Sequence, residues 1–437
     1  MKYVKIGDIA ELIRGVSYKK SDASNANCDK STAILRANNI VNGSFELSEL
    51  VYVPKELVKE EQYINKNDIM ITMSSGSKAH VGKVAIAVSD MNYAFGAFCG
   101  KIVVKKDVVP KFLYYLLING RFRSHIEKQC KGTNINNLKK DYILNYEFDL
   151  PSIHNQHRIV TRIEELFSQL DSGVETLKKT KEQLKVYRQA VLKEAFEGRY
   201  SSINHFDITS TKVDYDRIRK ENAVFKDVSG DDNELQIELP DDAFLIRFGN
   251  VFDVEVGATP KRSVPEYWNG NINWVSSGEV KFQSINNTEE MITENGLQNS
   301  STNVQPIGTV LLAMIGEGKT RGQAAILNIP AAHNQNTAAI LVSKTPCNPK
   351  YIYHYLNLSY ENTRRVGSGN NQKALNKERV RAIRFPFVSF EKQNIIVKEI
   401  ESRLSVCDSI EKTIDTALQE AEALRQSILK QAFEGGL

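Results

Sequence analysis

The chain has 437 residues and a mass of 49.3 kDa, too long for one ordinary hydrophobic core, so we expect two or more domains. The composition, 41% hydrophobic and 25% charged, is typical of a globular protein. No apolar run of about 18 residues and no signal-peptide pattern is present, so we expect no membrane span. The five cysteines are odd in number and lack CxxC spacing, which is typical of a reducing cytoplasm and predicts neither a disulfide framework nor a zinc site.

Residues 1–152 are expected to form a first mixed α/β domain. Short β-branched runs such as TAILRA and KIVVKK alternate with Asn, Gly and Ser turns, a pattern typical of strands. Residues 1–155 carry 22 basic and 16 acidic side chains, a net charge of +6, which favours a polyanionic partner. His154 and His157 have the spacing of a metal-ligand pair, but no third ligand lies nearby, so we expect no metal site.

Residues 153–199 predict one long helix. Apolar residues recur at steps of three, four and seven, and no proline interrupts them. At 1.5 Å per residue such a helix reaches about 60 Å, and its narrow apolar stripe requires a partner. The predicted seam of this helix consists of Ile159, Ile163, Leu166, Leu170, Leu177 and Leu184.

Residues 200–245 differ sharply in composition from both neighbours. They carry five basic and eleven acidic side chains, a net charge of −6, and are rich in Ser, Asp and Asn. We interpret this stretch as an acidic polar linker.

Residues 246–388 predict a second basic α/β domain, since residues 246–390 carry a net charge of +5. The stretch AMIGEGKT, residues 313–320, matches a loose phosphate-loop pattern, but strand-like residues follow where a phosphate loop needs a helix. We therefore expect Lys319 and Arg321 to lie in a loop that contacts DNA, with a phosphate-loop NTPase as the weaker alternative. No catalytic centre is evident.

Residues 389–437 predict a second long helix that repeats the first. LKQAFEG (429–435) repeats LKEAFEG (192–198) at an offset of 237 residues, and PKYIYHYL (349–356) resembles PKFLYYLL (110–117). The chain thus consists of two tandem units, each a variable domain followed by a helix. The helices carry opposite net charges, so we expect them to pair; the alternative is that each packs only on its own domain. The second predicted seam consists of Ile396, Ile400, Ile410, Ile414, Leu424 and Ile428.

With this repeat, the opening of the second domain closely resembles the DNA-sequence-specificity subunit of type I restriction–modification systems. That family often shows GxTPxxxxPEYWNGxIxWV at this place. The matching residues here are Gly257, Thr259, Pro260, Pro265, Glu266, Tyr267, Trp268, Asn269, Gly270, Ile272, Trp274 and Val275. Ala258 replaces the second glycine of the usual doublet, a mild departure. The resemblance covers nearly the whole chain.

The resemblance implies an α+β fold with two target recognition domains. Each is followed by a conserved helix, and the two helices pair as an antiparallel coiled coil with pseudo-twofold symmetry. It implies that each domain reads one half of a bipartite, asymmetric site in double-stranded DNA and that the helices set the gap. The chain itself would be non-catalytic and bind no cofactor. Two methyltransferase subunits would modify adenine and up to two restriction subunits would cleave, with S-adenosylmethionine, ATP and magnesium on these partners.

Candidate DNA contacts are polar or basic side chains in predicted loops, because Arg, Lys, Asn, Gln, Ser and Thr read base edges or phosphates. In the first domain they are Arg14, Lys19, Lys20, Arg36, Asn38, Asn39, Ser75, Ser77, Lys78, Thr133 and Asn134. In the second they are Thr259, Lys261, Arg262, Ser276, Ser277, Lys319, Arg321, Ser368, Asn370, Asn371, Gln372 and Lys373. A free-standing or decoy DNA-binding protein of the same architecture remains an alternative. We expect Trp268 and Trp274 to pack the domain rather than stack on bases.

Overall fold

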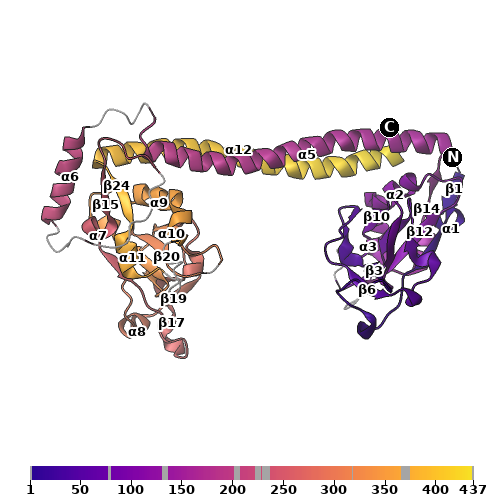
Figure 1. The fold of residues 1–437 in the computed structure, drawn as a ribbon, viewed down its shortest axis with the longest axis horizontal. Helices are drawn as coiled ribbons and strands as arrows, with labels where there is room; N and C mark the ends of the chain where they lie inside the picture. Colours follow the sequence, from indigo (N-terminus) through magenta and orange to yellow (C-terminus); the bar gives the residue numbers. More distant parts are fainter. Residues whose placement is uncertain are drawn as a thin grey trace. The chain divides into compact units, whose positions relative to one another are not determined.

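The computed structural model describes residues 2–76, 80–129, 136–200, 207–221, 228, 237–316, 318–365 and 375–435 (Figure 1). The chain divides into two compact units. Unit 1 comprises Met1–Lys179 and Ile414–Leu437, and unit 2 comprises Thr180–Thr413. The predicted two-domain α+β organisation is confirmed. Each long helix contributes one part to each unit.

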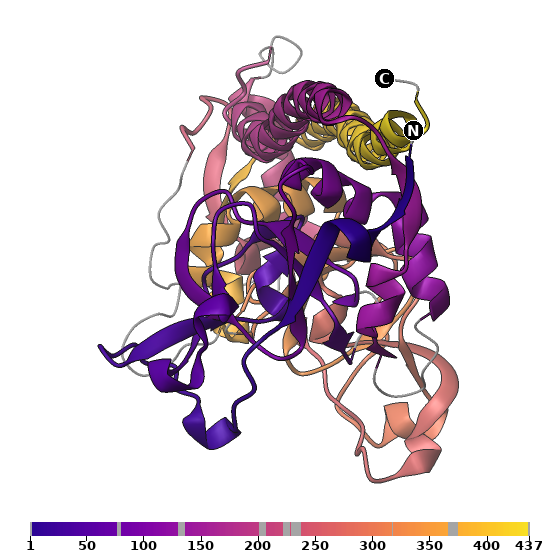
Figure 2. The same cartoon turned by 90° about the vertical axis from the view of Figure 1, so that its right-hand side faces the viewer.

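Unit 1 begins with a mixed α/β domain (Figure 2). Its strands are β1 (Lys2–Lys5), β2 (Ala10–Arg14), β3 (Ser31–Leu35), β4 (Ile40–Val41), β5 (Ser44–Phe45), β6 (Val51–Pro54), β7 (Tyr63–Ile64), β8 (Ile69–Thr72), β9 (Ser74–Ser75), β10 (Val84–Ile86), β11 (Met91–Phe95), β12 (Cys99–Val104), β13 (Asn136–Asn137) and β14 (Glu147–Leu150). Its helices are α1 (Ile6–Ile9), α2 (Pro110–Ile118), α3 (Gly120–Gln129) and α4 (Lys140–Leu144), followed by the long α5 (Ile153–Phe196).

Unit 2 has a similar order of elements, with α6 before its first strand and α8 between β19 and β20. Its strands are β15 (Phe244–Arg247), β16 (Val254–Val256), β17 (Trp268–Val275), β18 (Gln283–Ile285), β19 (Glu290–Ile292), β20 (Val310–Ala313), β21 (Ala324–Leu327), β22 (Ala332–His333), β23 (Thr337–Ile340) and β24 (Arg384–Phe387). Its helices are α6 (Ile208–Glu221), α7 (Phe248–Val251), α8 (Glu294–Gln298), α9 (Pro349–Leu358), α10 (Tyr360–Arg365) and α11 (Lys377–Ala382), followed by the long α12 (Phe390–Phe433).

Four strands of one sheet and three of the other pair in the same order in both units, to which unit 1 adds β7 and unit 2 adds β18. One sheet has the order β10-β8-β12-β2 in unit 1 and β18-β21-β20-β23-β16 in unit 2. A second sheet, β6-β3-β11-β7 or β19-β17-β22, contains one parallel pair in each unit, β3 with β11 and β17 with β22. This agreement allows residues of one unit to be matched to those of the other through backbone pairing.

Part of the stretch expected as an acidic linker forms helix α6, which packs on unit 2. Ile218 is buried in the hydrophobic core, and the Tyr215 ring lies 5.8 Å from that of Phe387. The Asp214 carboxylate accepts a hydrogen bond of 2.8 Å from the backbone N–H of Phe390, at the start of α12. The stretch is thus not a plain spacer, because Thr211, Tyr215 and Ile218 recur on one helical face that packs on the core, whereas Val213 stays exposed.

The first turns of each long helix are fastened to the preceding domain by a buried glutamine. Gln156 accepts a hydrogen bond from Val109 N (2.8 Å) and donates one to Pro151 O (3.0 Å). Gln393, 237 residues later, accepts from Asn348 N (3.0 Å) and donates to Val388 O (2.9 Å). Each side chain fixes the chain entering α2 or α9, whose first residue is a proline that needs no N–H partner.

The repeated AFEG segments end the two helices inside hydrophobic cores. Phe196 of α5 lies in the core of unit 2, with its ring centroid 5.0 Å from that of Tyr351 in α9. Phe433 of α12 lies against the core of unit 1, 5.2 Å from Phe112 in α2. Gly198 and Gly435, with φ of 68° and 82°, adopt the left-handed conformation that ends a helix. The AFEG sequence recurs because it packs against the corresponding hydrophobic core in each unit.

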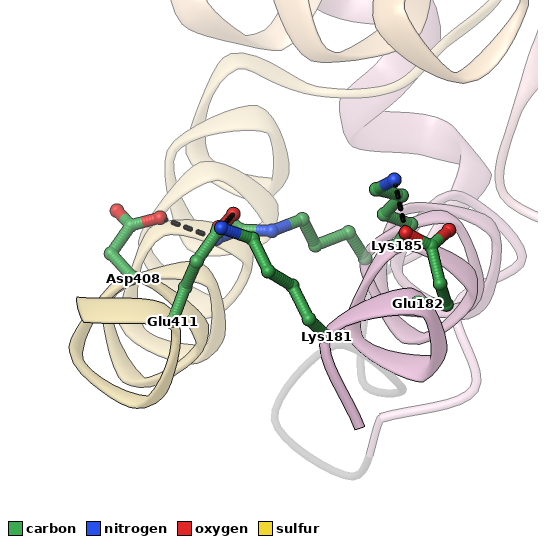
Figure 3. A network of polar contacts seen from close by, with 6 residues as sticks. Lys181, Glu182, Lys185, Asp408 and Glu411 are labelled. Carbon is green, nitrogen blue, oxygen red and sulfur yellow. Dashed lines mark hydrogen bonds and ion pairs between the residues drawn. The ribbon is translucent and has the colours of Figure 1, made fainter. Parts of the chain in front are cut away.

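Ion pairs between α5 and α12 show antiparallel pairing within each unit. In unit 2, Arg188 of α5 binds Asp408 (2.7 Å) and Glu411 (3.0 Å) of α12. Lys181 adds a weaker contact to Glu411 at 3.6 Å (Figure 3). In unit 1, Arg425 of α12 binds Asp171 of α5. The repeat offset converts one arginine–aspartate pair into the other with the helices exchanged. The expected pairing of the two helices is therefore confirmed, and the alternative that each packs only on its own domain is wrong.

The predicted seams are only partly buried. Ile163, Leu184, Ile396, Ile400, Ile414 and Ile428 are buried, whereas Ile159, Leu166, Leu170 and Leu177 are half-buried. Ile410 and Leu424 do not lie in a buried seam, since their side chains are 40% and 50% exposed. Two paired helices cover only a narrow strip of each other, and residues at the edge of the stripe remain in solvent. Within the described residues, no helix is both long and apolar enough to cross a membrane.

Candidate nucleic-acid interface

Three loops meet beside the sheets in each unit. The first loop is Gly15–Lys20 in unit 1 and Gly257–Arg262 in unit 2. The second is Arg36–Asn38 or Ser276–Gly278, and the third is Gly96–Phe98 or Asn334–Asn336. Backbone hydrogen bonds join them: Ala97 N donates to Val16 O (2.9 Å) and Gly96 N to Leu35 O (2.9 Å). In unit 2, Asn334 N donates to Val275 O (3.0 Å).

The first loop crosses the third so closely that only glycine fits. A Cβ atom on Gly15 would lie 2.3 Å from Gly96 O, and one on Gly257 would lie 1.9 Å from His333 O. Both distances are far below a van der Waals contact, and the obstacle is backbone, which cannot rotate away. Gly257 of the PEYWNG opening is therefore required by packing.

Replacing Gly257 with alanine is expected to displace the first loop of unit 2 and to reduce affinity for the cognate DNA more than tenfold. The added methyl group would force the loop away from His333 O, and with it the side chains of Thr259 and Lys261. Gly278→Ala is the matched control, because its Cβ would meet only Ser276 Oγ at 3.6 Å. DNA affinity can be measured by fluorescence anisotropy with the assembled complex. Equal affinities for both variants would show that the crossing does not position the interface.

A fourth segment extends the same surface. Met73 N donates to Phe98 O (2.8 Å), and Leu138 N donates to Met73 O (2.7 Å). The matching bonds in unit 2 run from Met314 N to Asn336 O (2.8 Å) and from Leu375 N to Met314 O (3.0 Å). Met73 and Leu138 in unit 1, and Met314 and Leu375 in unit 2, are thereby held beside the third loop. Among the described residues, candidates widely spaced in sequence are thus brought to one edge of each domain.

In unit 1 the candidates differ in accessibility. Arg14, Lys19, Lys20 and Asn38 are exposed, and Arg36 and Ser75 are half-buried. Ser77, Lys78, Thr133 and Asn134 lie outside the described residues. The four exposed side chains are available to a ligand on this surface.

Asn39 is a correction to the predicted contacts. Its side chain is only 1% exposed; it accepts a hydrogen bond from Arg36 N (2.9 Å) and donates one to Glu46 O (2.8 Å). Glu279 has the same role in unit 2, accepting from Ser276 N (2.7 Å). Asn39 therefore shapes the second loop from inside, and its amide is not free to read a base.

In unit 2, Lys261 and Lys319 are exposed, and Thr259, Ser276, Ser277 and Arg321 are half-buried. Ser368, Asn370, Asn371, Gln372 and Lys373 lie outside the described residues. Thr259 Oγ1 donates a hydrogen bond of 2.6 Å to Gln335 Oε1, which ties the first loop to the third.

Arg262 is engaged within the protein. Its guanidinium forms two hydrogen bonds to Glu290, one of 2.8 Å, and lies 3.9 Å from the ring centroid of Trp268. These hydrogen bonds hold the pKa of the Glu290 carboxyl below its usual value. Trp274 is 2% exposed and packs edge-on against Trp268. The cluster braces the first loop, and its arginine charge is largely compensated by Glu290.

The phosphate-loop alternative is not supported by the fold around Lys319. Strand β20 is followed by turns and then by strand β21, whereas a phosphate loop opens into a helix. Tyr360 instead donates a hydrogen bond to Lys319 O (2.5 Å), and Arg364 donates one to Gly318 O (2.5 Å). Helix α10 fixes the backbone of this turn, and the Lys319 side chain stays exposed.

Sequence reasoning missed the third loop, which offers Phe98 in unit 1 and Gln335 and Asn336 in unit 2. The Phe98 ring is 68% exposed, and Gln335 is exposed. The polar run HNQNT between two short apolar strands was the available signal for unit 2. Beneath it, burial lowers the pKa of His333 to about 4, so this side chain is neutral at pH 7 and acts as packing.

The described residues contain no group of three or more His, Cys, Asp or Glu side chains that could hold a metal ion. His154 and His157 are both exposed on the first turn of α5. The loops themselves present cations, amides and hydroxyls.

Comparisons with known proteins agree with this organisation. A family model described as the type I restriction modification DNA specificity domain matches residues 1–186 and 240–420. The chain is 29% identical to the type I restriction enzyme StySPI specificity subunit of Salmonella potsdam, and equally to the EcoKI specificity subunit of Escherichia coli K12. Each alignment covers 99% of this chain and 88% of the relative.

Two solved structures share the fold. A chain from work on complex assembly and conformational transition of the type I R-M system has a TM-score of 0.70 at 14% identity, covering 100% of this chain and 98% of that one. The HsdS subunit from Thermoanaerobacter tengcongensis has a TM-score of 0.54 at 15% identity, covering 100% and 97%. The family match over both units, together with the repeated domain–helix architecture, shows that this chain belongs to the type I restriction modification DNA specificity domain family.

Proposed function

We propose that this chain is the DNA-sequence-recognition subunit of a type I restriction–modification system, in which each unit reads one half of a bipartite site. The observation that carries the proposal is the convergence, in each unit, of the same loops from distant parts of the sequence onto one edge of a basic domain. Exposed Lys19, Lys20, Lys261 and Lys319 suit phosphate contacts. Asn38 and Gln335 offer amides that suit adenine edges.

The two units read different bases on this proposal. At matching positions of the three loops, unit 1 has Arg36 and Phe98, whereas unit 2 has Ser276 and Asn336. A guanidinium suits guanine and a hydroxyl accepts or donates to several bases, so the halves of the site are not copies of each other. The site is therefore asymmetric.

The chain is a non-catalytic subunit, and its partners supply the chemistry. Two methyltransferase subunits using S-adenosylmethionine modify adenine in the site. Up to two restriction subunits using ATP and magnesium cleave unmodified DNA. The two units repeat one domain–helix architecture, so the chain offers two similar faces and two copies of one partner can bind it. With DNA and these subunits as partners, we expect the protein to act in the cytoplasm.

Mapping methylated adenine across the host genome, with and without this gene, tests the proposal. Loss of one motif, consisting of two short specific blocks around a fixed gap, is the expected result. Restoring the gene should restore the motif, and the Gly257→Ala variant should not. A methylation pattern that does not depend on the gene, in a host whose methyltransferase is expressed, would favour a DNA-binding protein without enzyme partners.

The length of the helices should set the gap. One heptad can be inserted after Lys179 and one after Thr413, at the boundaries between the two units. Neither insertion separates the residues of the Arg188–Asp408 pair in unit 2 or of the Arg425–Asp171 pair in unit 1. Seven residues add about 10 Å of helix, so the gap should grow by about three base pairs. The readout is the methylated motif in cells that carry the variant. An unchanged gap would show that the helices are not the spacer.

A further inference from the structure

Unit 1 contains a cavity of about 790 Å³ where its first, second and third loops meet. Ligand pockets in proteins measure about 300–1,000 Å³, so the cavity is large enough for a small organic group. The lining residues that matter below are Tyr18, Lys20, Asn25, Arg36 and Phe98. Two of them, Lys20 and Arg36, are candidate DNA contacts from the sequence.

The equivalent loops of unit 2 are bridged. There Thr259 of the first loop donates a hydrogen bond of 2.6 Å to Gln335 of the third loop. The matching residues of unit 1 are Ser17 and Ala97. Alanine has no hydrogen-bonding group in its side chain, so this bridge cannot form in unit 1, and both residues line the cavity instead. The backbone of these loops is thus arranged alike in both units, and the cavity of unit 1 is open because its side chains differ from those of unit 2.

The walls of the cavity have the chemistry of a nucleotide site. The Phe98 ring is 68% exposed, although the backbone carrying it is fixed, because Phe98 O accepts hydrogen bonds from Met73 N (2.8 Å) and Ser74 N (3.1 Å). Arg36 Nε is buried and forms no hydrogen bond within the described residues. Exposed Lys20 and Asn25 add a cation and an amide. Aromatic rings, cations and amides together bind unpaired bases by stacking and by hydrogen bonds to their edges.

We propose that this cavity receives one nucleobase displaced from the DNA duplex, stacked on Phe98 with its edge on Asn25 and its phosphate near Lys20. A paired base exposes only its groove edge, which is read by side chains that protrude into the groove. A recessed pocket with an aromatic wall instead suits a base that has left the stack. The inference rests on the proposed function, and it adds a specificity site that unit 2, with its bridged loops, does not share.

The test uses the complete complex with its methyltransferase partner and duplexes that carry the mapped bipartite site. Each base pair of the half read by unit 1 is converted in turn into a mismatch by changing one strand only. Displacing a mismatched base requires less free energy than displacing a paired one. Wild-type protein should therefore bind about tenfold more tightly when one particular pair, distinct from the pair of the methylated adenine, is mismatched.

Phe98→Ala and Asn25→Ala should abolish this gain. Both side chains are exposed, so neither variant should lose stability. Val88→Ala is the matched control, because Val88 is 79% exposed in the same unit and does not line the cavity. A site without any mismatch that tightens binding, or a gain that survives Phe98→Ala, would overturn the inference while leaving the methylation motif, and thus the proposed function, intact. Absence of any gene-dependent motif would instead refute the proposed function.

Discussion

Replacing Phe196 with alanine is expected to destabilise unit 2 by about 3–5 kcal/mol, as for other buried phenylalanines. The ring is 1% exposed and lies 5.0 Å from Tyr351 and 5.6 Å from Tyr355, so its loss would leave a cavity between the end of α5 and α9. Urea unfolding, followed by hydrogen exchange of peptides from each unit, measures the effect. Exchange should accelerate in α9 and β24 and remain unchanged in α2.

Two variants test whether the effect belongs to the docked end of the helix. Val186→Ala lies on the same helix, where the side chain is 72% exposed, and should change stability by less than about 0.5 kcal/mol. Phe433→Ala should accelerate exchange in α2 and leave α9 unchanged, because Phe433 packs on the core of unit 1. If Phe196→Ala and Val186→Ala behave alike, the AFEG segment is not an anchor.

Replacing Asp242 with alanine is expected to cost about 3–5 kcal/mol, because it leaves a buried charge without its carboxylate partner. The Lys392 ammonium, whose side chain is 3% exposed, contacts both Asp242 oxygens at 2.6 and 2.7 Å. This pair fastens the end of the stretch before β15 to the first turn of α12. Urea unfolding of the two variants Asp242→Ala and Glu182→Ala measures the difference.

Glu182 is the comparison because its ion pair with Lys185 is exposed, and its loss should cost less than about 1 kcal/mol. The double variant Asp242→Ala/Lys392→Met should recover much of the stability lost in Asp242→Ala, because it removes the stranded charge. A double variant that is less stable than Asp242→Ala would show that the Lys392 ammonium is not a destabilising buried charge once Asp242 has been removed.

Local patterns in the sequence were sufficient to predict the tandem units, the two long helices and the basic α/β domains. Apolar residues on one face of a helix recur every three or four positions, which a short window of sequence reveals. The constant offset of 237 residues indicates that the same arrangement of elements occurs twice in the chain. The same patterns predicted wrongly that Ile410 and Leu424 lie in a buried seam, because spacing does not show how wide a strip the partner helix covers.

The recognition surface depended on tertiary structure. Exposed Lys19, Lys20, Lys261 and Lys319 could be chosen by residue type and loop position, whereas Asn39 and Arg262 could not be distinguished from them in sequence. Asn39 hydrogen bonds inside its own loop, and Arg262 binds Glu290 across the sheet. Residue type determines which contacts a side chain can form, but only the folded chain determines which partner is near enough to form them first.

The sequence by itself therefore determined the architecture and the family, since repeated helices and the PEYWNG stretch are local features of the chain. Only the tertiary structure decided that each AFEG segment closes a core built from α2 or α9. It also decided that a third loop completes each edge, with Phe98 in unit 1 and with Gln335 and Asn336 in unit 2. The physical reason is the range of the interactions. Helix periodicity arises between neighbours in sequence, whereas a core or a recognition surface is assembled from segments that meet only when the sheets have paired.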